Sequence, residues 1–252
     1  MYPTLIKIGH ISIYSYGVMV AAGFGISIYL ASLRTPLFGV RKDDLLDCAL
    51  YILIGGLAGA RLLYVALNFG YFKARPLEIF YLSQGGLAYY GAFLGGIAAG
   101  VIYVLKSGIS FWDTADLLAP YIALGQSIGR IGCLLNGCCY GRPVSDDFPF
   151  KVYFPQDHVA RHPTQVYSSL ILLALFAVLS MLQERRRFSG EIFLAYVFAY
   201  SFQRYFIEFL RGDNPAVVFG MTTSQLMSVL FFALSFFIYR KYLKRWKNTQ
   251  SL

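Results

Sequence analysis

Charged residues are scarce in this sequence. Only 14% of the 252 residues are charged, whereas 57% are hydrophobic. A soluble domain carries about a quarter charged residues, so this chain cannot cover a water-exposed surface in the usual way. Its four cysteines are too few for a disulfide framework, and no basic segment, apolar core and cleavage site mark a signal peptide. The composition predicts an integral membrane protein that folds as one domain over residues 1–252.

Seven apolar stretches are long enough to cross a bilayer, which takes roughly 20 helical residues. They lie at about 13–33, 45–67, 86–105, 116–136, 165–182, 190–209 and 223–239. They lack the alternation of barrel strands, and an open sheet cannot span lipid. The sequence therefore predicts an all-α polytopic membrane protein with about seven transmembrane helices. Glycine-rich runs within these stretches, such as GGLAGAR and GAFLGGIAAG, favour close helix packing.

The basic residues predict how the helices are oriented. With seven spans, twelve lysines and arginines fall on one side of the membrane and seven on the other. Because cytoplasmic loops carry the excess of basic residues, the N-terminus is expected outside and the C-terminus in the cytoplasm. The net charge of +9 then indicates contact with membrane lipid, with no role in nucleic-acid binding. A polar loop at about 137–162 is predicted on the outer face, where it could contact a substrate.

Several charged residues lie within or at the edges of the predicted spans. They are Asp47, Arg61, Arg130, Arg204 and Glu208. A charge at the centre of a membrane helix costs on the order of 2.5–3.5 kcal/mol, so each needs a partner or a wet cavity. Arg204 and Glu208 are four residues apart and can pair on one helix. Three arginines exceed the buried acids, and this excess predicts a site for an anionic group such as a lipid phosphate.

The segment GRIGCLLNGCCYGRP at residues 129–143 combines glycines, arginines, an asparagine and three cysteines. Zinc binding by Cys133, Cys138 and Cys139 is disfavoured by their spacing, since adjacent cysteines rarely bind one ion. His158 and His162 could in principle complete such a site, and a disulfide from Cys133 to either other cysteine stays open. The downstream HPTQ run begins a helix.

His162 and Gln165 at this helix start are expected to contact the substrate, because they lie at the predicted outer interface next to the arginines.

Seven motifs follow one another along almost the whole chain. They are YSYGVMVAAGF, GARLLYV, GGLAYYGAFLGG, GRIGCLLNGCCYGRP, RHPTQVY, YSFQRYFIEFLR and SQLMS. Single motifs such as GARLLYV are weak, but their joint order and spacing resemble the prolipoprotein diacylglyceryl transferase family. Seven spans with an outer N-terminus are also the arrangement of that family.

The resemblance implies a reaction at the bacterial cytoplasmic (inner) membrane. A diacylglyceryl group moves from phosphatidylglycerol to the lipobox cysteine of a prolipoprotein signal peptide, and glycerol phosphate leaves. Arg130 and Arg204 match family arginines, which implies that they bind the lipid phosphate and stabilise the departing group. The resemblance requires no metal and no other cofactor. Further residues on family motif positions, expected to contact substrate, are Tyr16, Asn136, Gly141, Tyr200 and Glu208.

Four positions depart from the family pattern. Tyr90 stands where a histidine, a candidate base, is usual; Cys133 replaces a common asparagine, Cys138 a common acid and Ser168 a common glutamate. Tyrosine has a pKa near 10 and is a poor base at neutral pH. We therefore consider three alternatives in order: the arginines promote thiolate formation, Tyr90 acts as an activated phenolate, or this is a divergent member with another acceptor.

Two alternative functions follow from the same residues. A divergent paralogue would transfer a lipid group to an acceptor other than a lipobox cysteine. A non-catalytic lipid-binding or transport protein would show inverted repeats with broken helices in corresponding halves. The sequence contains no such repetition, which favours the enzyme.

Overall fold

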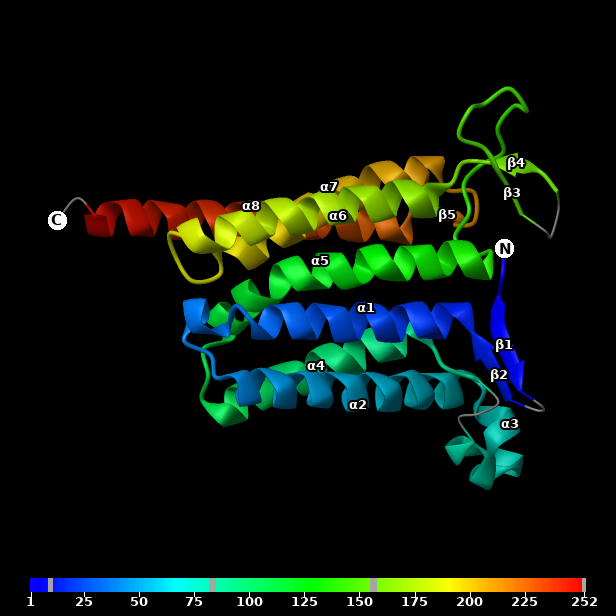
Figure 1. Ribbon diagram of the computed structural model, residues 1–252, viewed down its shortest axis with the longest axis horizontal. Helices are drawn as coiled ribbons and strands as arrows, with labels where there is room; N and C mark the ends of the chain where they lie inside the picture. The colour runs from blue at the N-terminus through cyan, green and yellow to red at the C-terminus, as the bar shows by residue number, and fades with distance from the viewer. Residues whose placement is uncertain (9–10, 82–84, 155–157, 251–252) are drawn as a thin grey trace. The chain divides into compact units, whose positions relative to one another are not determined.

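The computed structural model describes residues 1–8, 11–81, 85–154 and 158–250 (Figure 1). The α-helices are α1 (Ser15–Ser32), α2 (Lys42–Leu67), α3 (Phe69–Ala74), α4 (Tyr89–Ser107), α5 (Phe111–Asn136), α6 (Thr164–Leu182), α7 (Glu191–Leu210) and α8 (Thr223–Gln250). Short 3-10 helices are η1 (Thr35–Phe38), η2 (Pro76–Phe80) and η4 (Gln183–Arg185). The predicted all-α architecture is confirmed.

Short strands pair outside the long helices. Three antiparallel two-stranded sheets join β1 (Thr4–Ile8) to β2 (Ile11–Tyr14), β3 (Val152–Tyr153) to β4 (Ala160–Arg161) and β5 (Ala216–Val218) to β6 (Met221–Thr222). The β3–β4 pair lies in the polar loop predicted at about 137–162, with Val152 opposite Arg161.

The described residues include six helices that are long and apolar enough to cross a membrane: α1, α2, α4, α5, α6 with η4, and α8. The protein is therefore a multi-pass membrane protein, as predicted. The remaining predicted span, at about 190–209, corresponds to α7. Its 20 residues would reach about 30 Å, the thickness of the hydrocarbon core. Arg204 and Glu208 lower its apolar character.

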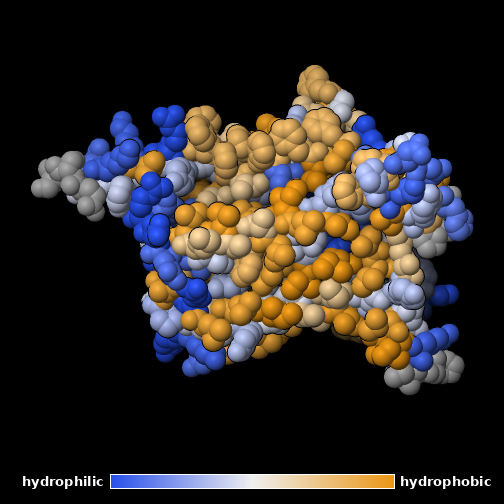
Figure 2. Space-filling view, turned by 45° about the horizontal axis from the view of Figure 1, so that its top comes forward, coloured by the Kyte–Doolittle hydropathy of each residue, from blue (hydrophilic) through white to orange (hydrophobic). Residues whose placement is uncertain are grey.

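Exposed apolar side chains cover the long helices. Leu62 of α2 is 67% exposed, Leu170 of α6 is 61% exposed and Phe237 of α8 is 69% exposed. Figure 2 shows hydrophobic residues along the helices and hydrophilic ones toward helix ends. A soluble protein rarely exposes so much apolar surface, whereas lipid solvates it.

The chain forms two compact units. The first comprises residues 1–31 and 115–252, and the second comprises residues 32–114. The single domain over residues 1–252 stays a prediction.

The second unit is built on the pairing of α2 with α4. A side chain on Gly59 would overlap the carbonyl oxygen of Gly91, and a side chain on Gly95 would overlap that of Gly55. The two backbones therefore approach so closely that only glycine fits. This confirms the packing role predicted for the glycine runs.

The first unit has an apolar core where α5, α6 and α7 meet. Ala123 of α5, Leu172 of α6 and Tyr196 of α7 belong to this core. Polar contacts within the unit add specificity: the Ser127 and Ser169 hydroxyls lie 3.0 Å apart between α5 and α6. Such hydrogen bonds between helices help to hold a membrane bundle together.

A buried aspartate ties the start of α7 to α5. Asp116 is fully buried and accepts backbone hydrogen bonds from Gly190 at 2.7 Å and Phe193 at 2.8 Å. Arg186 also pairs with it at 3.3 Å. Free N–H groups at a helix N-terminus favour a carboxylate, so Asp116 caps α7. This end of the first unit also holds the C-terminal part of α8 (Figure 1).

The basic residues of the α6–α7 turn and of the end of α8 therefore gather at one end of the first unit. The predicted outer N-terminus and cytoplasmic C-terminus remain predictions.

Candidate active site

Three segments of the first unit meet at a backbone junction around Gly141. Its N–H donates to the His162 carbonyl at 3.1 Å, and the Arg142 N–H donates to the Leu210 carbonyl at 2.8 Å. A side chain on Gly141 would lie 2.5 Å from both the Cβ and the carbonyl oxygen of His162. The loop after α5, the segment before α6 and the end of α7 are thus joined by a residue that must be glycine. The close packing of Gly141 against His162 fixes the loop after α5 beside the segment before α6.

The same loop is held by two buried side chains at the start of α6. Gln165 donates to the Cys138 carbonyl at 2.7 Å, and Thr164 donates to the Cys139 carbonyl at 2.8 Å. Cys139 has a φ of 64°, in the left-handed region that favours glycine. A non-glycine residue there costs on the order of 1–3 kcal/mol and persists only where its surroundings impose it. The two hydrogen bonds supply that constraint.

Gln165 also has a buried side-chain oxygen without a hydrogen-bond partner among the described residues. The expected contact of Gln165 with substrate stays a prediction, because its amide nitrogen is already used to hold the loop.

A carboxylate buried at the end of α7 organises the neighbouring polar groups. Glu208 is 2% exposed and pairs with Arg204 at 2.9 Å and with Arg211 at 3.9 Å. Its other oxygen accepts hydrogen bonds from Asn214 at 2.6 Å and Thr222 at 2.8 Å. The predicted pairing of Arg204 with Glu208 is confirmed. Glu208 therefore links α7 to the segment that leads into α8.

Arg204 has a second contact, to the Ser224 hydroxyl at 2.9 Å. This contact directs its guanidinium toward the start of α8.

Three guanidinium groups lie close enough to interact electrostatically. Arg130 of α5 interacts with Arg211, and Arg204 interacts with both. Arg211 also forms a bidentate pair with Asp213, at 2.8 and 2.6 Å. Among the described residues, Arg130 has no carboxylate at ion-pair distance. Three arginines and two carboxylates leave an excess of positive charge, and Arg130 is the member without an acidic partner.

Arg211 is a member of this group that the sequence did not predict, because it is one of the seven basic residues outside the predicted spans on the less basic side. It follows α7 directly and has an exposed fraction of 9%. Burial lowers its pKa, but the hydrogen bonds to Asp213 and its charge outweigh this and raise the pKa above the ordinary arginine value. Its spacing of three residues from Glu208 on a helix was the available signal.

Arg61 lies elsewhere, in the second unit. It was predicted to bind a phosphate together with Arg130 and Arg204, but its guanidinium donates hydrogen bonds to backbone carbonyls. These belong to Glu78 (2.5 Å), Ile79 (2.7 Å), Gly85 (3.0 Å), Gly86 (3.0 Å) and Tyr81 (3.3 Å). Backbone groups that need partners near lipid account for this arginine. Its role is to hold the segment before α4.

The remaining predicted site residues divide between the two units. Tyr16 of α1 lies against α5, where a side chain on Gly132 would contact its ring at 3.4 Å. Tyr200 of α7 stacks on Tyr196, with 5.7 Å between ring centroids, and interacts electrostatically with Arg130.

Asn136, at the end of α5, contacts the Cys138 thiol. The His162 ring packs edge-on against Phe148 at 4.8 Å and lies 3.5 Å from the Tyr167 hydroxyl. Tyr90 belongs to the second unit, in the first turn of α4. It is 65% exposed.

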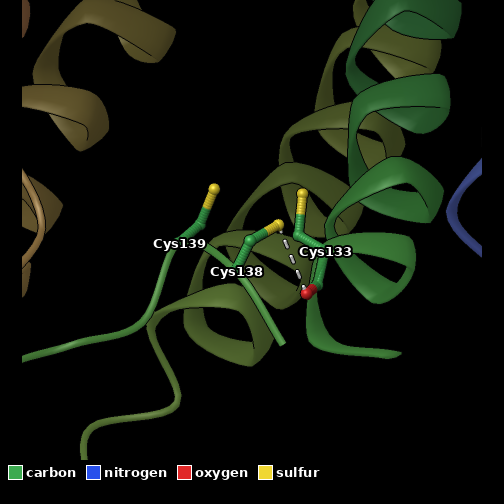
Figure 3. A group of neighbouring side chains, drawn as sticks. All are labelled: Cys133, Cys138 and Cys139. Atoms are coloured by element: carbon green, nitrogen blue, oxygen red, sulfur yellow. Dashed lines mark hydrogen bonds between the residues drawn. The ribbon is translucent and has the colours of Figure 1, made fainter. Parts of the chain in front are cut away.

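Three cysteine side chains gather beside the arginines. The sulfur atoms of Cys133, Cys138 and Cys139 all lie within 4.8 Å of one another, and the cysteines are free (Figure 3). The Cys138 thiol donates to the Cys133 carbonyl at 3.6 Å. The pKa of Cys139 is lowered, first by the neighbouring thiols of Cys133 and Cys138 and also by the positive charges of Arg211 and Arg130.

The apolar helices and the buried ion pairs define an integral membrane protein with a basic polar site at one end of a helical unit. Comparison with known proteins identifies the family. Residues 3–240 match the family described as prolipoprotein diacylglyceryl transferase, and the chain belongs to that family. It is therefore a member of a family of transferases, as the motifs predicted.

Similar proteins carry the name phosphatidylglycerol–prolipoprotein diacylglyceryl transferase. The one from Oceanobacillus iheyensis is 35% identical over 249 residues, covering 94% of this chain and 87% of the relative. The one from Clostridium tetani is 34% identical over 244 residues, covering 95% and 97%. The one from Bacillus velezensis is 33% identical over 241 residues, covering 92% and 89%. The likeness thus extends over nearly the full length of each protein.

Proposed function

We propose that this chain transfers the diacylglyceryl group of phosphatidylglycerol to the lipobox cysteine of prolipoprotein signal peptides, in the bacterial inner membrane. Glycerol phosphate is released. The family and the names of the similar proteins support this reaction. The observation that carries the proposal in the structure is Arg130, a half-buried guanidinium beside two other arginines and without an acidic partner among the described residues.

The arginines have complementary roles in the proposed step. The acceptor thiolate attacks the glycerol carbon, a carbon–sulfur bond forms, and the carbon–oxygen bond to phosphate breaks. Negative charge then develops on the departing phosphate oxygen. Arg130 binds this phosphate, since a guanidinium matches its geometry. Arg204 is oriented by Glu208 and Ser224 and adds to the stabilisation of the leaving group.

Tyr16, Asn136 and Tyr200 line the same region in this proposal. Tyr200 and Asn136 are close to Arg130 and Cys138 respectively, where they can contact the headgroup. His162 packs between aromatic rings, so we assign it to the wall of the site. The arginines are expected to promote formation of the acceptor thiolate, and an activated phenolate at Tyr90 stays the second alternative.

A reconstituted assay tests the proposal. The purified chain in phosphatidylglycerol vesicles receives a synthetic lipobox peptide, and mass spectrometry follows addition of diacylglyceryl to its cysteine. We expect Arg130→Ala to reduce turnover by about 10²–10³-fold, the usual effect of removing one group that stabilises developing charge. Arg130→Lys should restore part of the rate, because lysine keeps the charge but not the bidentate geometry.

The matched control is Arg75→Ala. Arg75 is exposed and its pair with Glu78 at 3.6 Å is a surface contact, so turnover should stay at the wild-type level. Turnover by Arg130→Ala within about threefold of wild type would refute the assigned role. A wild-type chain that binds phosphatidylglycerol but never modifies the peptide would favour the divergent paralogue.

A further inference from the structure

Three cysteines meet at the end of α5 in the tertiary structure. Cys133 lies in the last turns of α5, and Cys138 and Cys139 follow in the loop after it. These residues bring three sulfur atoms within 4.8 Å of one another at the end of α5. No described histidine or carboxylate joins this group. Among the described residues, the site therefore offers three thiol ligands and leaves a further position open.

The distances suit one soft metal ion. Zinc–sulfur bonds of about 2.3 Å at tetrahedral angles place sulfur atoms about 3.8 Å apart. The three thiols must therefore approach one another by about 1 Å or less. The backbone is already held near the shape this requires: Cys139 is in the left-handed conformation, and Gln165 and Thr164 donate to the carbonyls of Cys138 and Cys139. The unfavourable spacing in sequence is overcome by this turn.

The surrounding charge suits a metal bound by three thiolates. Such a complex of Zn²⁺ has a net charge of −1, and Arg211 and Arg130 lie within electrostatic range of Cys139. Both cations would stabilise the complex. In catalytic zinc sites three protein ligands leave one position open for water or substrate.

We propose that Cys133, Cys138 and Cys139 bind a zinc ion whose open position takes the cysteine thiol of the acceptor peptide. This inference rests on the proposed function. A thiol bound to Zn²⁺ is deprotonated, so the acceptor thiolate forms without a separate base. The thiolate attacks the glycerol carbon, the carbon–sulfur bond forms and glycerol phosphate leaves with the carbon–oxygen electron pair. The proton of the thiol passes to solvent, and no oxidant or reductant is needed.

Metal content is the first test. The full chain, purified in detergent with its native metal, should contain about one zinc per chain by elemental analysis. Cys138→Ser and Cys139→Ser should each lose most of it. Cys48→Ser is the matched control, because Cys48 is a buried cysteine of α2 outside the group, and it should keep its zinc. A wild-type chain without zinc, or a zinc content that is equal in all variants, would overturn the inference.

A second test needs no variant and so does not depend on how the variants fold. Wild-type protein loaded with Co²⁺ should show thiolate-to-cobalt charge-transfer absorption, which should change when the lipobox peptide is added. A peptide with serine in place of its cysteine should produce no change. A cobalt spectrum without thiolate bands, or a disulfide among the three cysteines in the active enzyme, would contradict the proposal.

The two proposals fail in different ways. Zinc-free protein that transfers diacylglyceryl at the wild-type rate overturns the metal's role and leaves the proposed function standing. Protein whose cobalt spectrum responds to the peptide thiol but which never transfers lipid supports the metal site and contradicts the proposed function.

Discussion

Replacing Glu208 by alanine tests whether this residue stabilises the fold or binds the substrate. The family resemblance predicts contact with substrate, whereas in the structure both oxygens of the carboxylate already contact protein groups. One oxygen pairs with Arg204 at 2.9 Å, and the other accepts hydrogen bonds from Asn214 and Thr222. We expect Glu208→Ala to lower the stability of the first unit before it affects substrate binding.

The magnitude follows from burial. The side chain of Glu208 is fully buried and that of Arg204 is 14% exposed. Breaking a buried ion pair by removing one partner costs about 3–5 kcal/mol, because the other charge is left without compensation. At about 2–4 °C per kcal/mol, the thermal midpoint should fall by about 6–20 °C. Glu208→Gln should lose less, since its amide oxygen can still accept from Asn214 and Thr222.

The assay is thermal unfolding in detergent, with and without phosphatidylglycerol. Glu78→Ala is the control, because its pair with Arg75 is exposed and contributes about 0–1 kcal/mol. A change of less than about 2 °C in Glu208→Ala, together with weaker lipid binding, would refute the structural role. That result would assign the carboxylate to the substrate.

Three other substitutions test separate parts of the structure. Gly141→Ala should destabilise the fold and abolish transfer, since its Cβ would overlap His162; a wild-type melting midpoint would contradict this packing. Tyr90→Phe should retain transfer in the reconstituted assay if the thiolate forms without a phenolate base; loss of activity to background would assign the base to Tyr90. Asp116→Ala should cost about 2–6 kcal/mol of unfolding free energy, because the N–H groups of Gly190 and Phe193 each lose their acceptor at about 1–3 kcal/mol; in denaturant titration, a loss below about 1 kcal/mol would exclude the capping role.

The helices could be predicted from the sequence because lipid constrains them locally. Every backbone polar group within the bilayer must find a partner, and a helix satisfies this within one segment. Long apolar runs therefore predicted α1, α2, α4, α5, α6 and α8. The cost of charge in such helices likewise drew attention to Arg130, Arg204 and Glu208. Motif order was enough to predict the family.

The partners of those charges were decided by the tertiary structure. Arg61 and Arg130 are both arginines within predicted spans. Arg61 donates hydrogen bonds to five backbone carbonyls, whereas Arg130 lies near two other arginines. Arg211 resembled a loop charge until the end of α7 brought it to Glu208. The acceptors of Arg61 and the arginines near Arg130 lie in other segments of the chain, so residue spacing does not encode those contacts. The spacing of three residues between Glu208 and Arg211, in contrast, does allow their pair.

The three cysteines also show the difference between what the sequence predicts and what the tertiary structure decides. Their presence in GRIGCLLNGCCYGRP is a property of the sequence, and two adjacent thiols at that spacing argued against a shared ligand. A left-handed residue at Cys139, in a loop held by Thr164 and Gln165 from another helix, nevertheless leaves the three sulfur atoms within 4.8 Å of one another. The composition determined that this protein lies in a membrane. Only the folded backbone, by closing distances between its segments, determined which side chains share its polar site.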